Sequence, residues 1–272
     1  MASPTATMPR LFQMPPAGRY WITWSCKATK KDAPFVTTHT ARLLFQPEHD
    51  WSDEVEAGSL VAHKIHWHAI EESGKDLLTT VSEVSSDKKA SVARLLRSLS
   101  EGALLSDDDD ANVPTTPPSA SDDADVRDLA DVVPTLHDIC PYDELTGGDV
   151  LYVDEVKILP PFRKCGFGLL LVERADHLLN SHLSMCLLNP RPLLQENDGT
   201  SEMKKAALEV ATAKIERYFQ LLGFERLQVG SSQYLARWNG SYHPTVCVNA
   251  AGAVTGIRQH LGLCHSGDLD EP

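Results

Sequence analysis

The hexapeptide Arg163-Lys164-Cys165-Gly166-Phe167-Gly168 decides how the fold of this chain is interpreted. It follows an apolar, strand-like run at residues 151–159 and the bend Pro160-Pro161, and it opens a helix-like run at residues 169–179. The first turn of a helix has backbone N–H groups without partners and the positive end of the helix dipole, so it favours an anion. Glycines let an anion approach the backbone closely, and the two basic side chains supply opposite charge. The pattern therefore predicts a phosphate-binding turn between a strand and a helix.

Two motifs carry a resemblance to a known family. The run Val156-x-Ile158-x-Pro160-x-x-Arg163-x-x-Gly166-x-Gly168-x-x-Leu171 resembles the acyl-CoA-binding motif of the GNAT superfamily of N-acetyltransferases. The run Tyr218-Phe219-Gln220-Leu221-Leu222-Gly223-Phe224 is similar to the family's late helix, which ends in a Gly-Phe step. Together the motifs cover residues 148–238. The resemblance implies an α/β fold (α+β in some schemes) with a mixed, mostly antiparallel sheet and helices on both faces.

The resemblance also implies a co-substrate, acetyl-CoA. In the family, the motif strand pairs with the pantetheine arm where it splays from the next strand, at residues 183–188 here, and the turn holds the pyrophosphate. The expected activity is transfer of an acetyl group to an amine of a small molecule, peptide or protein, by direct attack in a ternary complex. The implied binding residues are Val156, Lys157, Ile158, Leu159, Arg163, Lys164, Cys165, Gly166, Phe167, Gly168 and Leu169.

Acetyl transfer needs a base for the amine, donors for the oxyanion and a leaving thiolate. Asp154 and Glu155 are the candidate bases, and because side chains alternate along a strand, only one of them is expected to face the cleft. The resemblance implies an oxyanion donor near Ile158. The family's thiolate-protonating tyrosine would fall on Phe219, so Tyr218, about 100° away around the helix, is the remaining candidate acid or a residue of the cleft wall.

Composition limits the classes of protein. The 272 residues, 42% of them hydrophobic, suffice for one large or two small units with a core. The net charge is −13, without a basic stripe, so no nucleic-acid partner is expected. No apolar run approaches the roughly 20 residues of a membrane span, and the N-terminus lacks a signal-peptide core. Six cysteines without a Cys-x-x-Cys pair indicate reduced thiols in an intracellular, most simply cytoplasmic, protein.

The chain is interpreted as a single GNAT-like domain at residues 17–258 between flexible tails at 1–16 and 259–272. An acidic segment rich in Pro, Ser and Thr at residues 104–126 is expected to be a disordered insertion, with a linker between two domains as the alternative. The further elements expected are strands at 19–24, 40–45, 60–70, 183–188, 226–229 and 233–238, and helices at 76–104, 126–136 and from the N-cap Ser201 to Gly223.

Three alternatives to this interpretation have specific sequence features. His66 and His68 would share one face of a strand at 60–70, with His63 on the other, and two ligands do not make a zinc site, so no metal is expected. These histidines are expected to face solvent or the acceptor cleft instead. A non-catalytic acyl-CoA-binding or protein-interaction module is favoured by Phe219 in place of tyrosine. A nucleotide-binding oxidoreductase would need a third glycine at Leu171.

Overall fold

The structure is a computed structural model and describes residues 12–27, 35–49, 53–74, 148–180, 182–190, 192, 201–229, 232–239 and 243–259. Seven strands form one sheet in the order β1-β2-β3-β4-β5-β7-β6. Within it β4 and β5 are parallel, and every other neighbouring pair is antiparallel. The sheet strands are β1 (Gly18–Lys27), β2 (Val36–Pro47), β3 (Val55–Ile65), β4 (Asp149–Ile158), β5 (Leu183–Leu188), β6 (Glu225–Val229) and β7 (Ser232–Trp238).

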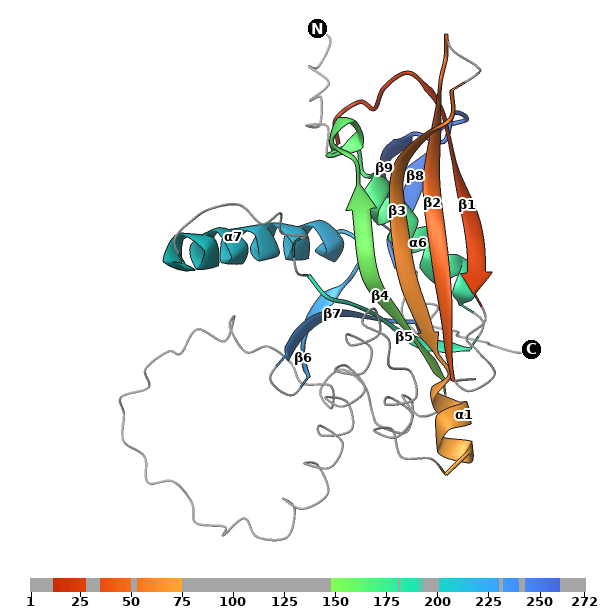
Figure 1. Cartoon of the computed structure of the whole chain (residues 1–272), viewed down its shortest axis with the longest axis vertical. Coiled ribbons are helices and arrows are strands. Elements are labelled where there is room, and N and C mark those ends of the chain that lie inside the picture. Colours follow the sequence, from red (N-terminus) through yellow and green to blue (C-terminus); the bar gives the residue numbers. More distant parts are fainter. Residues whose placement is uncertain are drawn as a thin grey trace, which may run out of the picture.

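The helices lie on both faces of this sheet (Figure 1). One face packs against α6 and the C-terminal end of α7 in the larger core cluster, with residues such as Leu169, Leu171 and Phe219. The other face packs against α1 in a smaller cluster that contains Trp67 and Ile70. The expected mixed, mostly antiparallel fold is therefore confirmed. The described helices are α1 (Trp67–Glu72), the 3-10 turn η4 (Pro160–Phe162), α6 (Phe167–Leu179) and α7 (Ser201–Gln220).

One predicted strand is wrong at its end. The run expected to be extended to residue 70 leaves the sheet at Ile65, and α1 begins at Trp67. Trp67 and Ile70 are three positions apart, which places both on one side of a helix, and both are buried in the smaller cluster. The arrangement of His63, His66 and His68 on alternate faces of one strand is therefore wrong as well.

A hairpin of β8 (Thr245–Val248) and β9 (Val254–Arg258) was not among the expected elements. It covers the start of α6, where Val254 contacts Gly166. The expected strands at 19–24, 40–45, 183–188, 226–229 and 233–238 are confirmed, as are the motif strand and helix. The expected helices at 76–104 and 126–136, the acidic insertion and the last residues of the chain lie outside the described residues.

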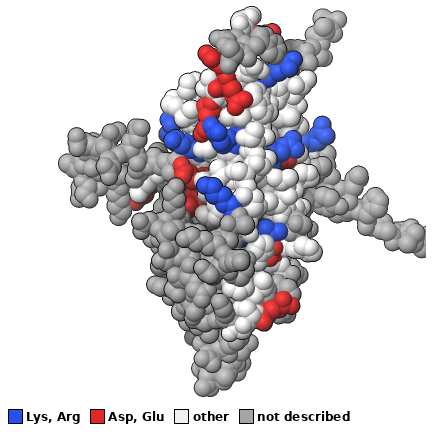
Figure 2. All heavy atoms as spheres, turned by 45° about the vertical axis from the view of Figure 1, so that its right-hand side comes forward, with Lys and Arg blue, Asp and Glu red and all other residues white. Residues whose placement is uncertain are grey.

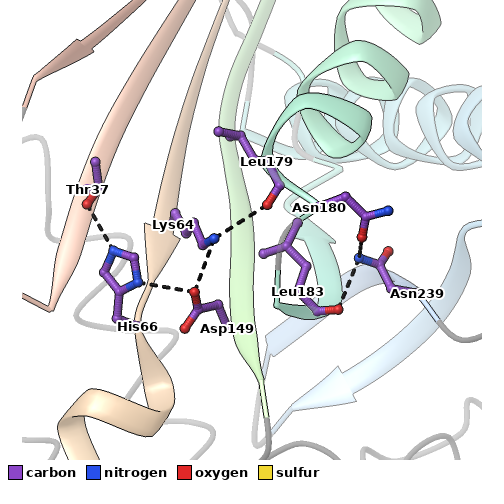
Figure 3. A network of polar contacts seen from close by, with 8 residues as sticks. All are labelled: Thr37, Lys64, His66, Asp149, Leu179, Asn180, Leu183 and Asn239. Atoms are coloured by element: carbon purple, nitrogen blue, oxygen red, sulfur yellow. Dashed lines mark hydrogen bonds and ion pairs between the residues drawn. The ribbon is translucent and has the colours of Figure 1, made fainter.

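Polar contacts fix the end of β4 that lies away from the glycine turn (Figure 3). Lys64 Nζ lies 3.2 Å from Asp149 Oδ2 and donates to the carbonyl of Leu179, the last residue of α6. A cation at a helix C-terminus complements the helix dipole. His66 contacts the same carboxylate at 3.1 Å and joins it to Thr37 of β2. These contacts hold the start of β4 and the end of α6 in a fixed relation.

A buried ion pair joins α6 to β7, the strand that follows β5 in the sheet. Arg237 of β7 bonds to Asp176 of α6, and its second Nη donates to the carbonyl of Leu222, just after α7. The guanidinium also lies over the ring of Phe224, 5.0 Å from its centroid. The pair therefore ties together the two helices that carry the two sequence motifs.

Candidate functional site

The candidate functional site is built around an irregularity in β4. In the ladder with β3, Glu155 faces Val61 and Val153 faces Ala62, so Asp154 is an extra residue, a β-bulge. Bulges bend a strand and re-aim its side chains. On the other edge of β4, the ladder with β5 runs from Asp149 to Val153 and ends at the bulge. β5 ends at Leu188, the partner of Val153, whereas β4 continues past the bulge to Ile158, so the edge of β4 beyond the bulge is not paired with β5.

The bulge changes the direction of both candidate bases. Val153 and Val156 pack in the larger core cluster with their ladder partners, so both point to the α6 face of the sheet. Asp154 and Glu155 lie between them, and Asp154 approaches His63, whose ring stacks on Tyr152 on the opposite face. Both carboxylates therefore lie on the face away from α6, and both line the cleft described next. The expectation that they point to opposite faces is wrong, because the extra residue breaks the alternation.

A cleft of about 630 Å³ fills the space where β4 and β5 diverge. Its walls come from the second half of β4, the end of β5, the glycine turn and one face of α7. Its volume lies in the range usual for pockets that bind cofactors and drug-sized ligands. It is lined by Val153, Asp154, Glu155, Val156, Ile158, Phe162, Arg163, Lys164, Phe167, Gly168, Leu188, Asn189, Pro192, Ala211, Lys214, Ile215, Tyr218 and Phe219.

Backbone groups of β4 face this cleft. The N–H of Leu159 donates to the carbonyl of Ala57, near the start of β3. Antiparallel ladders alternate, so Lys157 and Glu155, in phase with Leu159, also direct their backbone groups to β3. The N–H and C=O groups of Val156 and Ile158 then point to the edge that β5 has left. Consistent with this, Arg163 Nε donates to the Ile158 carbonyl at 3.0 Å.

The glycine turn has a backbone that requires glycine at one position. Gly166 caps α6 with φ +83°, and a Cβ there would lie 2.8 Å from Val254 Cγ1. Lys164 also has positive φ, and its carbonyl accepts from the N–H of Gln13, so the N-terminal segment crosses the turn. Cys165 is buried, its thiol donates to the Arg163 carbonyl, and burial raises its pKa, so it fills the core.

Tyr218 reaches the start of α6 from α7. Its hydroxyl accepts from the N–H of Leu169 at 3.2 Å, and burial raises its pKa to about 12, so it keeps its proton at neutral pH. The Tyr218 hydroxyl thus occupies the backbone N–H of Leu169, one of the helix-start groups that the sequence predicted would bind an anion. Phe219 is buried and packs edge-on against Phe224. At the position where the family has its tyrosine, this chain therefore has the ring of Phe219 packed in the core, and the hydroxyl belongs to the preceding residue, Tyr218.

The structure brings together some of the predicted site residues and not others. Six predicted cofactor residues line the cleft, together with both candidate bases and Tyr218, while Lys157 and Leu159 pair with β3. Cys165, Gly166 and Leu169 support the turn from outside the cleft lining. The six are Val156, Ile158, Arg163, Lys164, Phe167 and Gly168.

Sequence patterns missed one residue near this cleft and did not place a second one beside its carboxylate. Lys214 lines it from α7, and His63 lies beneath Asp154. Helical phase from Tyr218, four positions later, was the available signal for Lys214. His63 was considered in the sequence with His66 and His68, for which solvent or the acceptor cleft was expected, but no local pattern placed it beneath a carboxylate. Figure 2 shows one face of the molecule, on which Lys and Arg lie among Asp and Glu rather than in a single basic stripe.

Comparisons with protein-family models, with curated proteins and with solved structures each found no match for this chain. Within the described residues, no helix has the length and hydropathy to cross a membrane. In the same part of the chain, no group of three or more His, Cys, Asp or Glu side chains is arranged to hold a metal ion.

Proposed function

We propose that the protein is an N-acetyltransferase that transfers the acetyl group of acetyl-CoA to an amine. The divergence of β4 from β5 beside the N-terminus of α6 carries this proposal. It places an open strand edge, a basic turn and a helix start around one cleft. The open strand edge suits the thioester and the pantetheine arm of acetyl-CoA, and the basic turn together with the helix start suits the pyrophosphate.

The pantetheine arm contains two amides, which suit an open strand edge. Val156 and Ile158 direct N–H and C=O groups to that edge, so an amide-bearing chain can pair with β4 in place of β5. The N–H of Ile158 also provides a donor for the thioester oxygen as it becomes an oxyanion. Apolar side chains of Phe162, Phe167 and Ile215 line the cleft between the polar groups.

The pyrophosphate suits the basic end of the cleft. Arg163, Lys164 and Lys214 line it from the turn and from α7. The phosphate would enter beside the start of α6, where Tyr218 now accepts from Leu169. An anion at that place either displaces the tyrosine hydroxyl or receives its proton in a hydrogen bond. In both arrangements the phosphate charge is balanced by side chains and by the helix dipole.

The carboxylates of Asp154 and Glu155 suit the amine. A protonated amine is a cation, and both carboxylates lie on the sheet face away from the α6 turn. One of them takes a proton from the amine, whose lone pair then attacks the acetyl carbon. The new C–N bond forms, the C–S bond breaks with its electron pair on sulfur, and the second amine proton neutralises the thiolate. A thiol with a pKa near 8.5 leaves without obligatory protonation by a tyrosine.

A thermal-shift titration of the full chain tests acetyl-CoA binding. Ligand at about 100 times its dissociation constant should stabilise the fold by roughly 2.7 kcal/mol. Arg163→Glu should weaken this stabilisation, because Arg163 lines the cleft and is exposed. Arg258→Glu makes the same charge change at an exposed residue outside the cleft and is the matched control. No stabilisation by millimolar acetyl-CoA or by longer CoA esters would reject the proposal.

A panel of primary amines and a lysine-containing peptide, assayed by release of CoA thiol, tests the transfer itself. A second function, a non-catalytic acyl-CoA-binding module, is favoured by the burial of Phe219 where a tyrosine would act. CoA-dependent stabilisation without thiol release across the panel would support this second function. Thiol release with any amine, together with a matching acetylated product, would support the transferase.

A further inference from the structure

A buried histidine lies directly beneath one of the cleft carboxylates. His63 of β3 is 3% exposed, and its Nε2 lies 3.5 Å from Asp154 Oδ2, an ion-pair distance longer than a hydrogen bond. Within the described residues, this Nε2 has no hydrogen-bond partner. A buried polar nitrogen without a partner destabilises the fold, so the position favours a contact that completes it. A small rotation of Asp154, which is 25% exposed, provides that contact.

The other ring nitrogen of His63 defines which tautomer faces Asp154. Its Nδ1 lies 3.1 Å from Thr38 Oγ1 of β2. A hydroxyl can donate or accept, whereas a carboxylate can only accept. A lone pair on Nε2 would face the carboxylate charge, so the favoured state has Nε2–H toward Asp154 and the Thr38 hydroxyl donating to Nδ1. The three residues then form a chain of donors that runs from β2 through β3 to the cleft.

We infer that Asp154 is the general base for the amine and that His63 is its positioning residue, an assignment that rests on the proposed transferase function. The bulge aims the Asp154 side chain at both the cleft and His63. Glu155, the other cleft carboxylate, lies in ladder register with Val61 on the same sheet face. Asp154 thus combines access to an acceptor amine with a buried donor that fixes its orientation.

The proton transfer balances with these groups alone. The ammonium group of the acceptor gives one proton to the Asp154 carboxylate, and the resulting neutral amine attacks the acetyl carbon as described above. His63 donates to the second oxygen of Asp154 throughout and so holds the accepting oxygen toward the amine. After transfer, the Asp154 carboxyl returns its proton to solvent through the open cleft.

The charged and titratable groups near His63 in the described residues are Asp154, Glu155, Tyr152, His39, Lys64 and His66.

The test measures acetyl-CoA stabilisation, kcat and the pH–rate profile with the best amine of the panel. Asp154→Asn should keep the thermal shift by acetyl-CoA and lose at least about 100-fold in kcat. Glu155→Gln should lose less than about tenfold. His63→Leu removes the donor and leaves an apolar neighbour that disfavours the Asp154 carboxylate, so the acidic limb of the profile should move to higher pH. His63→Gln keeps an N–H at the position of Nε2 and should restore the limb.

Other outcomes overturn the assignment. Equal losses in Asp154→Asn and Glu155→Gln, or a larger loss in Glu155→Gln, would show that Asp154 is not the base. An unchanged profile in His63→Leu would show that His63 has only a packing role. Glu56→Gln, on the exposed part of β3, is the control for a carboxylate lost outside the cleft. If the wild-type chain binds acetyl-CoA but uses no amine, or does not bind it, the transferase itself fails, which is distinct from failure of a single variant.

A second readout does not depend on activity. Histidine labelled with ¹⁵N allows the two ring nitrogens of His63 to be followed separately by NMR. Asp154→Asn should change the chemical shift of His63 Nε2, because the carboxylate that this nitrogen faces is replaced by an amide that can donate as well as accept. Glu155→Gln should change it less. An equal response to both substitutions would refute the specific pairing of His63 with Asp154.

Discussion

Replacement of Gly166 by alanine should destabilise the fold by two separable effects. The residue has φ +83°, a left-handed conformation that strains an L side chain by about 1–2 kcal/mol. A Cβ would also lie 2.8 Å from Val254 Cγ1 and 3.3 Å from Phe12 Cγ, so the hairpin and the N-terminal segment would have to shift. Overpacking of this kind costs about 1–3 kcal/mol. We expect Gly166→Ala to lower the free energy of unfolding by roughly 2–5 kcal/mol.

Gly74 offers a matched control. It has φ +62°, and no heavy atom lies within 4 Å of the place its Cβ would take. Gly74→Ala therefore retains the backbone strain without the steric contact, and about 1–2 kcal/mol is expected. Urea unfolding followed by circular dichroism gives both values, provided that the dependence on denaturant is unchanged. Equal losses in the two variants would refute the packing of the β8–β9 hairpin on the turn.

This difference also decides how the phosphate turn should be tested. A bulky residue at Gly166 would unfold the turn before it could repel a phosphate, so loss of ligand binding would carry no information. Arg163 is the better position, because it is exposed and, within the described residues, its side chain donates to the backbone carbonyl of Ile158. Arg163→Glu should therefore lower acetyl-CoA affinity with little change in the stability of the ligand-free chain.

Three further results follow from the geometry. Asp176→Asn leaves the buried Arg237 guanidinium without its carboxylate and should lower the free energy of unfolding in urea by about 3–5 kcal/mol. The double variant Asp176→Leu with Arg237→Met should recover most of this loss. Arg42→Ala, which breaks a surface ion pair, should cost under about 1 kcal/mol. Tyr218 has its pKa raised from 10 to about 12 by burial, so the stability it contributes is present below pH 10 and lost toward pH 12; Tyr218→Phe should flatten that decline. Burial lowers the pKa of His243 below its ordinary value of 6.5, so as the pH falls the unfolded chain takes up this proton more readily than the folded chain does. The free energy of unfolding should therefore decrease as the pH drops below 6.5, and it should decrease less steeply in His243→Gln.

Local patterns predicted the motif region well because its signals are local. A strand, a Pro-Pro bend, a glycine turn and an apolar helix follow one another within residues 149–179, and each boundary has its own chemistry. The family resemblance predicted that β4 and β5 separate here, and the ladder between them does end at Val153 and Leu188, beyond which β4 continues without β5. The existence of acetyl-CoA binding and of transfer stays a prediction.

The errors arose where distant residues decide the structure. Trp67 and Ile70 lie in a helix because this places both side chains in the smaller core cluster. The composition of residues 60–70 favours a strand and does not reveal this tertiary contact. The β8–β9 hairpin has two short strands, and its role in covering Gly166 is a tertiary contact. The bulge at Asp154 depends on the register with β3, so strict alternation was the wrong rule for the two carboxylates.

The bulge at Asp154 connects these observations. An extra residue bends β4, and the ladder with β5 ends at that point. The same residue turns two neighbouring carboxylates to one face, while the basic turn and the start of α6 lie on the other. A thioester threaded through the opening would thus meet positive charge at its phosphate end and negative charge at its acyl end. Deletion of Asp154 should remove the bulge, restore strict alternation between Val153, Glu155 and Val156, straighten β4 and narrow the cleft beside the end of β5. Loss of acetyl-CoA stabilisation in a folded variant would register this change.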